Sequence, residues 1–157
     1  GNVVYNNLIY GSNYGLSIDA GNLSEFKNNI LWSTKANAKY ITVTSAASIM
    51  NSSNNIIGPF GSGAIINYRG SSYSSLAAFK SSFSTLEINS ISVNPLFVNE
   101  GTDFHLTSSS PARNAGVSIP LTRDFDGNVI TSGSKPDIGA YQYQGTKLNP
   151  PSNLRVQ

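Results

Sequence analysis

The sequence predicts an all-β fold, built as a parallel β-helix of about three coils. Three segments repeat an Asn-Asn pair followed by two aliphatic residues, and the pairs begin at Asn6, Asn28 and Asn54. A second strand-like segment, rich in Ile, Val, Tyr and Thr, follows each pair. Several short strands in a period near 22 residues are typical of a solenoid whose coils stack about 4.8 Å apart. A β-sandwich with coincidental Asn-Asn pairs is the alternative.

Composition indicates an exported protein of neutral polarity. Charged residues make up 11% of the sequence, against about 25% in ordinary globular domains. Ser and Asn contribute 44 of the 157 residues. The net charge is +2 and the basic residues are scattered, so we expect no nucleic-acid binding. The length predicts one domain, and a surface of hydroxyls and amides suits an extracellular setting.

The sequence contains no cysteine and no apolar run long enough to cross a membrane. The lack of cysteine fits bacterial export, where disulfides are optional, and excludes thiol nucleophiles and thiolate zinc sites. No signal peptide stands at the start, where Gly1 leads directly into strand-like residues. We therefore expect the C-terminal part of a longer β-helix, with its first coil exposed or covered by another molecule.

Within the coils, matched positions are expected to stack on one another. Leu8, Ile30 and Ile56 are the aliphatic residues that we expect to fill the interior. The Asn pairs are expected at turns, because Asn tolerates the left-handed backbone conformation and can form hydrogen bonds to its stacked neighbour.

After residue 68 the pattern changes. Residues 71–86 place Leu76, Phe79, Phe83 and Leu86 at helical spacings, with Ser residues before the first turn that can cap it. Residues 87–98 return to strand, and an irregular, Pro- and Gly-rich segment follows. We expect coils over residues 1–70, the helix and closing segment of the same domain over 71–146, and a linker to a following module over 147–157.

Residues 93–116 have the densest set of reactive side chains in the chain. His105 is the only histidine, and its strand-like setting predicts an outward-facing or structural side chain with no obvious orienting partner. We interpret the stretch as a lid that closes the end of the coil stack. The expected apolar plugs of this lid are Leu96, Val98, Phe104 and Leu106.

Five stretches over residues 71–143 carry a family resemblance: "LAAF", "NSISVNPLFVN", "DFHLTSSSPARNAG", "RDFDGNVI" and "PDIGAYQY". In this order they resemble the C-terminal part of secreted bacterial right-handed parallel β-helix proteins of the choice-of-anchor Q type. That type is similar to β-helix polysaccharide lyases and surface proteins. The resemblance implies a right-handed β-helix in an extracellular, polysaccharide-related setting. It transfers no catalytic residues, because the matching motifs belong to the closing segment.

Aromatic residues beside the repeats suggest carbohydrate binding, since sugar rings stack on exposed aromatic faces. The candidates are Trp32, Tyr40 and Tyr68, with Arg69 beside them, and Tyr73 is a further aromatic residue nearby. We expect the ligand to be a polysaccharide or a cell-surface glycan. Packing residues are the competing explanation, especially for Trp32 at a strand end.

Catalysis within this chain is not expected. Glycoside hydrolysis needs two carboxyl groups about 5–10 Å apart, and Asp19 and Glu25, the only acidic residues of the repeats, do not occupy equivalent positions. A lyase needs a base and a group that neutralises a uronate, and the residues that could supply them also suit solvated outer turns: Lys27, Lys35, Lys39, Tyr40 and Arg69.

The motif "RDFDGN" offers oxygen ligands at Asp124, Asp126 and Asn128, as at the start of a calcium loop. Lys135 stands where an EF-hand would place its glutamate, and a turn stabilised by Asp side chains explains the same residues. No cofactor is expected, with calcium as the alternative. Two functions remain open: a non-catalytic carbohydrate-binding, structural or adhesive module, and a fragment of a polysaccharide lyase or hydrolase with its catalytic coils upstream.

Overall fold

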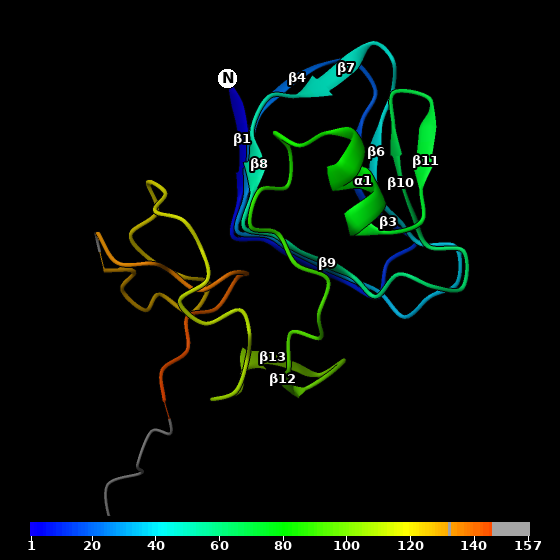
Figure 1. The fold of residues 1–157 in the computed structure, drawn as a ribbon. Helices are drawn as coiled ribbons and strands as arrows, with labels where there is room; N and C mark the ends of the chain where they lie inside the picture. Colours follow the sequence, from blue (N-terminus) through cyan, green and yellow to red (C-terminus); the bar gives the residue numbers. More distant parts are fainter. Residues whose placement is uncertain (132, 146–157) are drawn as a thin grey trace, which may run out of the picture.

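A computed structural model of the chain describes residues 1–131 and 133–145, so the expected linker over 147–157 lies outside the described residues. The described part is mostly β, with one short helix (Figure 1). Three parallel sheets carry most of the strands, and each sheet takes strands from successive passes of the chain. Their strands are β1 (Asn2–Tyr5), β4 (Gly21–Lys27), β7 (Ala47–Ile49) and β8 (Ser52–Ser53); β2 (Leu8–Tyr10), β5 (Ile30–Trp32) and β9 (Ile56–Gly58); and β3 (Tyr14–Ile18), β6 (Lys39–Val43) and β10 (Ile65–Tyr68), with β11 (Ser71–Tyr73) antiparallel to β10.

The register of the second sheet matches the repeats. Leu8 pairs with Ile30 and Ile30 pairs with Ile56, as the Asn-Asn motif predicts. One strand of each sheet, β1, β2 or β3, lies at a sheet edge. In Figure 1 the strands of the three sheets surround a central space in which α1 is seen.

The side of the sheet on which the repeat aliphatics lie differs from the prediction. Leu31 and Ile57, the second aliphatic of two repeats, are buried in a core cluster that takes residues from all three sheets. Ile30 and Ile56, which we expected inside, instead belong to a second cluster with residues of the C-terminal segment. Successive side chains of a strand point to opposite faces of the sheet. One aliphatic residue of each pair therefore packs on the central cluster, and its neighbour packs on the C-terminal segment that covers the other face.

The predicted helix is present but shorter than residues 71–86. α1 covers Leu76–Ser82, and the hydroxyl of Ser75 caps it by accepting a hydrogen bond from the backbone N–H of Ala78 at 3.0 Å. Leu76 and Phe79 are buried in the first core cluster. Because α1 brings these side chains onto the same cluster as the coil residues, this helix, and not residues 93–116, covers that cluster.

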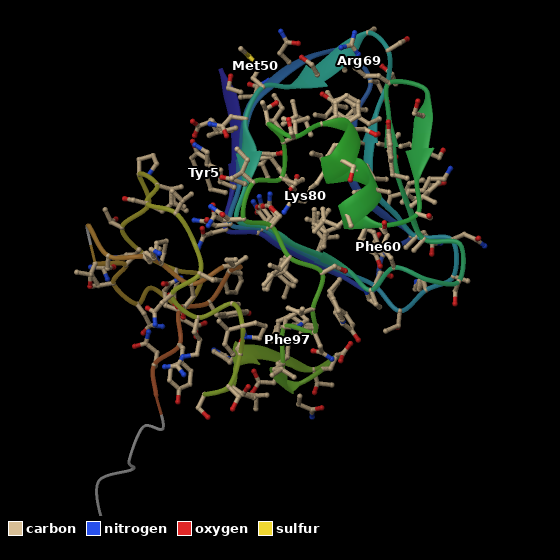
Figure 2. The ribbon with its side chains drawn as sticks, in the orientation of Figure 1. Tyr5, Met50, Phe60, Arg69, Lys80 and Phe97 are labelled. Atoms are coloured by element: carbon tan, nitrogen blue, oxygen red, sulfur yellow. The ribbon has the colours of Figure 1, made fainter. Side chains whose placement is uncertain are left out.

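Residues 93–116 pack elsewhere. They include the antiparallel strands β12 (Phe97–Asn99) and β13 (Asp103–Leu106), which lie outside the ring of strands, beside β9 (Figure 1). The expected plugs Leu96 and Val98 are 40% and 55% exposed, whereas Phe97 and Leu106 are buried in the second cluster. Leu96 adopts a left-handed backbone (φ 54°), which interrupts the strand alternation on which the prediction rested. Figure 2 shows Phe97 on the hairpin formed by these two strands.

None of the helices in the described part of the chain is long and apolar enough to span a membrane.

Candidate functional site

The second Asn of each pair forms a ladder of stacked amides. The side-chain oxygen of Asn29 accepts hydrogen bonds from the backbone N–H of Asn7 (2.9 Å) and from its amide (3.2 Å). Asn55 does the same for Asn29, at 2.8 and 3.1 Å. The ladder ends on Ser90, whose hydroxyl accepts from the backbone N–H of Asn55 at 2.8 Å, and on Glu87. The predicted hydrogen bonds between stacked Asn residues are therefore confirmed.

The first Asn of each pair adopts the predicted left-handed backbone, with φ between 49° and 58° at Asn6, Asn28 and Asn54. Its side chain points to the C-terminal segment. Asn28 donates to the carbonyl of Val117 at 2.8 Å and accepts from the backbone N–H of Val117 at 2.9 Å. Asn6 donates to the carbonyl of Gly139 at 2.9 Å. This second row of amides therefore fixes the C-terminal segment against the parallel sheets.

Buried Asp137 then holds the segment together. One carboxylate oxygen accepts from the backbone N–H of Asn114 at 2.7 Å, and the other accepts from that of Tyr143 at 2.6 Å. Gly139 packs so closely that an added Cβ would lie 2.6 Å from the Cδ1 atom of Ile30. In "PDIGAYQY", Asp137 is therefore present for its hydrogen bonds to the backbone, and Gly139 because a side chain would collide with Ile30.

This docking leaves a groove of about 630 Å³ between the first strands of the chain and the C-terminal segment. Four aromatic rings line it, together with amide, guanidinium and carboxylate groups. Phe125 is 78% exposed, and its ring packs edge-on against Tyr141, with the ring centroids 5.6 Å apart. Tyr10 and Phe104 lie with their centroids 4.9 Å apart. The lining residues are Asn6, Asn7, Leu8, Tyr10, Phe104, Leu121, Arg123, Asp124, Phe125, Ala140 and Tyr141.

His105 lies next to this groove with a carboxylate on each side of its ring. Its Nδ1 is 2.6 Å from the Oδ1 atom of Asp103, and its Nε2 is 2.7 Å from the Oδ2 atom of Asp126. The ring also stacks on Tyr141, with the centroids 4.4 Å apart. The side chain is exposed, as predicted, but the expectation that it has no orienting partner is wrong. The partner Asp126 comes from a turn 21 residues further along the chain.

The groups in this cluster shift one another's pKa values. The hydrogen bonds to Asp126 and Asp103 raise the pKa of His105, and partial burial acts in the opposite direction. Hydrogen bonds from the backbone and the ring of His105 lower the pKa of Asp103. Burial raises the pKa of Tyr141, with a further contribution from the nearby carboxylates. The cluster therefore stabilises the protonated form of His105 relative to that of an isolated histidine.

The three aromatic residues predicted to bind sugar are buried. Trp32 donates from its indole nitrogen to the Oε1 atom of Glu100 at 3.2 Å. Tyr40 donates to the carbonyl of Pro59 at 2.8 Å, and burial raises the pKa of Tyr40 to about 12. Tyr68 packs between rings of the helix region. These rings fill the interior, so the predicted aromatic binding face is not formed by them.

Arg69, predicted beside them, is exposed and has a left-handed backbone (φ 50°) at a turn. In Figure 2 it lies near the top of the molecule, and the groove residues do not include it. Tyr73, on β11, packs edge-on against Phe79 and Phe83.

The residues considered for a lyase take part in separate contacts. Lys27 forms an ion pair with Glu25 at 2.8 Å, and Glu25 also accepts a hydrogen bond from Tyr5. Lys39 lies over the ring of Tyr14, 5.6 Å from its centroid. Lys35 is exposed in a loop. The contacts of Lys27 and Lys39 therefore stabilise the strands on which these residues lie.

Asp124, considered for calcium, uses its carboxylate to hold a turn. Its Oδ1 accepts from the backbone N–H groups of Asp126 (3.0 Å) and Asn128 (2.7 Å). Its Oδ2 accepts from the side-chain amide of Asn128 (3.0 Å) and from the backbone N–H of Gln142 (2.9 Å). This arrangement is the Asp-stabilised turn that the sequence offered as the alternative to a cation loop.

No family model matches the chain, and no curated protein is significantly similar to it. The resemblance to choice-of-anchor Q proteins therefore stays a hypothesis. The groove has to be interpreted from its own chemistry.

Sequence reasoning missed Phe125 and Tyr141 as site residues. Phe125 stands between two aspartates in "RDFDGN", and an aromatic residue inside so polar a turn is a usable signal for an exposed ring. Tyr141 alternates with Tyr143 in "AYQY", and that pattern alone does not show which ring faces a groove.

Proposed function

We propose that this chain is a non-catalytic, carbohydrate-binding part of an extracellular, modular β-helix protein. The single observation that carries the binding proposal is the groove, where aromatic rings stand beside hydrogen-bonding groups. Binding sites for polar ligands combine such apolar surfaces with a few placed polar groups. Sugar rings present apolar C–H faces and hydroxyl rims, and both parts have a counterpart in this groove.

Each kind of group has a defined contribution. Phe125 and Tyr141 offer ring surface at the groove wall. Arg123 lines the same groove and uses one guanidinium nitrogen, Nη1, to donate to the carbonyl of Gly127 at 2.6 Å. A guanidinium group has five N–H donors, so donors remain for ligand hydroxyl or carboxylate oxygens. Asn7 is exposed on the opposite side of the groove, on the first pass of the chain. Its amide nitrogen donates to Tyr5 and Asn29, so its side-chain oxygen is the group that it offers to a ligand.

Three features support a right-handed parallel β-helix. The chain contributes strands to the same three parallel sheets on successive passes. The second Asn of each pair forms hydrogen bonds to its counterpart on the next pass, and the first Asn of each pair repeats the same left-handed backbone. Parallel connections within one sheet are right-handed in about 98% of cases, because of the strand twist. The neutral polar composition supports the extracellular setting.

The experiment is a binding screen of the intact chain against soluble oligosaccharides of neutral hexoses, N-acetylhexosamines and uronates. We expect one of these classes to bind. Phe125→Ala or Tyr141→Ala should weaken binding about tenfold, since loss of a stacking ring costs about 1–3 kcal/mol per base at single-stranded nucleic-acid sites.

Tyr14→Ala is the matched control, because Tyr14 is 60% exposed on β3 and does not line the groove. It should leave the affinity unchanged. Binding of no oligosaccharide, or equal loss in the Tyr14→Ala and Phe125→Ala variants, would contradict the proposal.

A further inference from the structure

The two carboxylates of His105 come from different parts of the chain. Asp103 is two residues away in β13, whereas Asp126 belongs to the turn over residues 124–128. The His105 ring therefore connects the β12–β13 hairpin to a turn of the C-terminal segment. The groove proposal makes no use of this connection.

Only the protonated ring can donate to both carboxylates. A neutral imidazole has one N–H group and one lone pair, so one of the two aspartates must then face a lone pair. Asp103 keeps a second hydrogen bond, because its Oδ1 also accepts from the backbone N–H of His105 at 3.0 Å. That backbone bond holds the Asp103 oxygen against Nδ1, where a ring lone pair would face an anion that cannot move away. The single proton of a neutral His105 therefore stays on Nδ1, and the bond to Asp126 is the one that is lost.

Asp126 directly follows the exposed groove residue Phe125. The ring of Phe125 packs on Tyr141, and Tyr141 stacks on His105. The backbone of the turn is held separately. The Asp124 carboxylate accepts four hydrogen bonds, one of them from the backbone N–H of Asp126, and the backbone N–H of Phe125 donates to the carbonyl of Ala140 at 2.9 Å. Loss of the Asp126 contact therefore acts on the side chains of Asp126 and Phe125 and leaves the backbone of the turn in place.

The two carboxylates beside the ring favour its protonation. Asp103 faces it from β13, and Asp126 faces it from the turn. Tyr141 covers one face, and the Asp103, Asp124 and Asp126 carboxylates all raise the pKa of that tyrosine. The imidazolium thus has two negative neighbours in hydrogen-bonding contact.

We propose that His105 is a pH-sensitive clamp, which holds the side chains of Asp126 and Phe125 at the tip of the turn when the ring is protonated and releases them when the ring is neutral. The aromatic wall of the groove is then ordered at lower pH and loosens as the pH rises. As a control of ligand binding this rests on the proposed function. The coupling between His105 and Phe125 is present without any ligand.

The test is an NMR titration of the ligand-free chain between about pH 5 and about pH 9. His105 is the only histidine, so its ring signals need no assignment. The Phe125 ring is assigned by comparison with the Phe125→Leu variant. We expect the Phe125 signals to shift with the same midpoint as the His105 ring.

Two variants separate the clamp from a general effect of pH. Asp126→Asn should lower the His105 midpoint and remove the matching Phe125 shift, and His105→Gln should remove the Phe125 shift altogether. Asp19→Asn, an exposed carboxylate on the first pass of the chain, should change neither. Phe125 signals that stay constant through the His105 titration, or that shift equally in His105→Gln, would overturn the clamp. A failed oligosaccharide screen with this coupling intact would remove only the binding proposal.

Discussion

The side-chain amide of Asn55 donates a hydrogen bond to the Oε2 atom of Glu87 at 2.9 Å, and the ladder of stacked amides thereby ends on a fully buried carboxyl group. The hydroxyl of Ser90 donates to the same oxygen at 2.6 Å. The other oxygen, Oε1, has no hydrogen-bond partner among the residues that the structure describes. The stability of the stacked strands should therefore depend on the protonation of Glu87.

Burial raises the pKa of Glu87. Stability from the neutral form is then fully present below the ordinary carboxyl pKa of about 4.3 and is lost as the pH rises through the raised value. Glu87→Gln keeps the acceptor without the charge, so it should melt at a higher temperature than the wild type at alkaline pH and similarly at low pH. Thermal melts across this pH range check the prediction, with Asp19→Asn as the exposed control.

Glu87→Ala should be destabilising by about 1–3 kcal/mol at low pH, because the amide of Asn55 and the hydroxyl of Ser90 lose their buried acceptor. Chemical denaturation measures this difference. A Glu87→Ala variant as stable as the wild type would show that these hydrogen bonds contribute nothing net.

The ladder itself is tested at Asn29, whose side chain is buried and both donates and accepts along the stack. Asn29→Ala leaves backbone and amide groups of both neighbouring coils without partners, and it should cost about 1–3 kcal/mol or more of the free energy of unfolding. Asn51→Ala is the matched control, because Asn51 is exposed and its side chain is outside the ladder. Equal stabilities of the two variants would remove the energetic role of the ladder.

Residues of the β12–β13 hairpin differ in burial, so their substitutions should differ in their effect on the free energy of unfolding. Phe97→Ala should cost about 3–5 kcal/mol, because Phe97 is buried in the second cluster. Phe104 is only half-buried, so Phe104→Ala should cost less. Val98→Ala should change the free energy of unfolding by no more than about 0.5 kcal/mol, since Val98 is exposed. The reverse order, measured by denaturation, would support the lid that we expected from the sequence.

The His105 cluster gives a pH profile of stability. The raised pKa of His105 means that its contribution is complete below the ordinary histidine pKa of about 6.5 and is lost as the pH rises through the raised value. The lowered pKa of Asp103 means that its contribution is complete above the ordinary value of about 3.9 and is lost as the pH falls through the lowered value. Both contributions are complete between about pH 3.9 and about pH 6.5. The melting temperature of the wild type should therefore exceed that of His105→Gln most clearly in this range. A difference that does not vary with pH would show that the ring acts through packing alone.

The backbone features of the repeats could be predicted because they depend on local chemistry. A left-handed turn favours Asn, and stacked amides need equal positions in successive passes, so the Asn-Asn pairs identified both. A fourth, weaker copy follows α1. Asn89 is also left-handed, Ser90 ends the ladder, and Ile91 bridges to Ile56. The substitution of Ser for the second Asn hid this copy from the motif.

The direction of the aliphatic side chains could not be predicted in the same way. Both aliphatic residues of each pair are apolar, so the pattern does not say which of Ile30 and Leu31 faces the central cluster. The answer depends on whether the outer face of the sheet is covered, and the C-terminal segment that covers it is irregular. No periodicity in the sequence shows that this segment docks there.

The candidate site was missed for the same reason. Its groove brings Tyr10 of the first pass close to Phe125 and Tyr141 of the C-terminal segment. Aromatic residues near the repeats instead fill the core, as Trp32 and Tyr40 do. A long-range docking, and not a spacing in the sequence, creates the exposed aromatic surface.

The most direct test of carbohydrate binding is NMR chemical-shift mapping of the intact chain during titration with the oligosaccharides of the screen. The proposed function predicts saturable shifts that concentrate on Phe125, Tyr141 and Arg123. Saturable shifts centred instead on Tyr14 and Lys39, on the face formed by β3 and β6, would contradict it, and so would the absence of shifts with every oligosaccharide class.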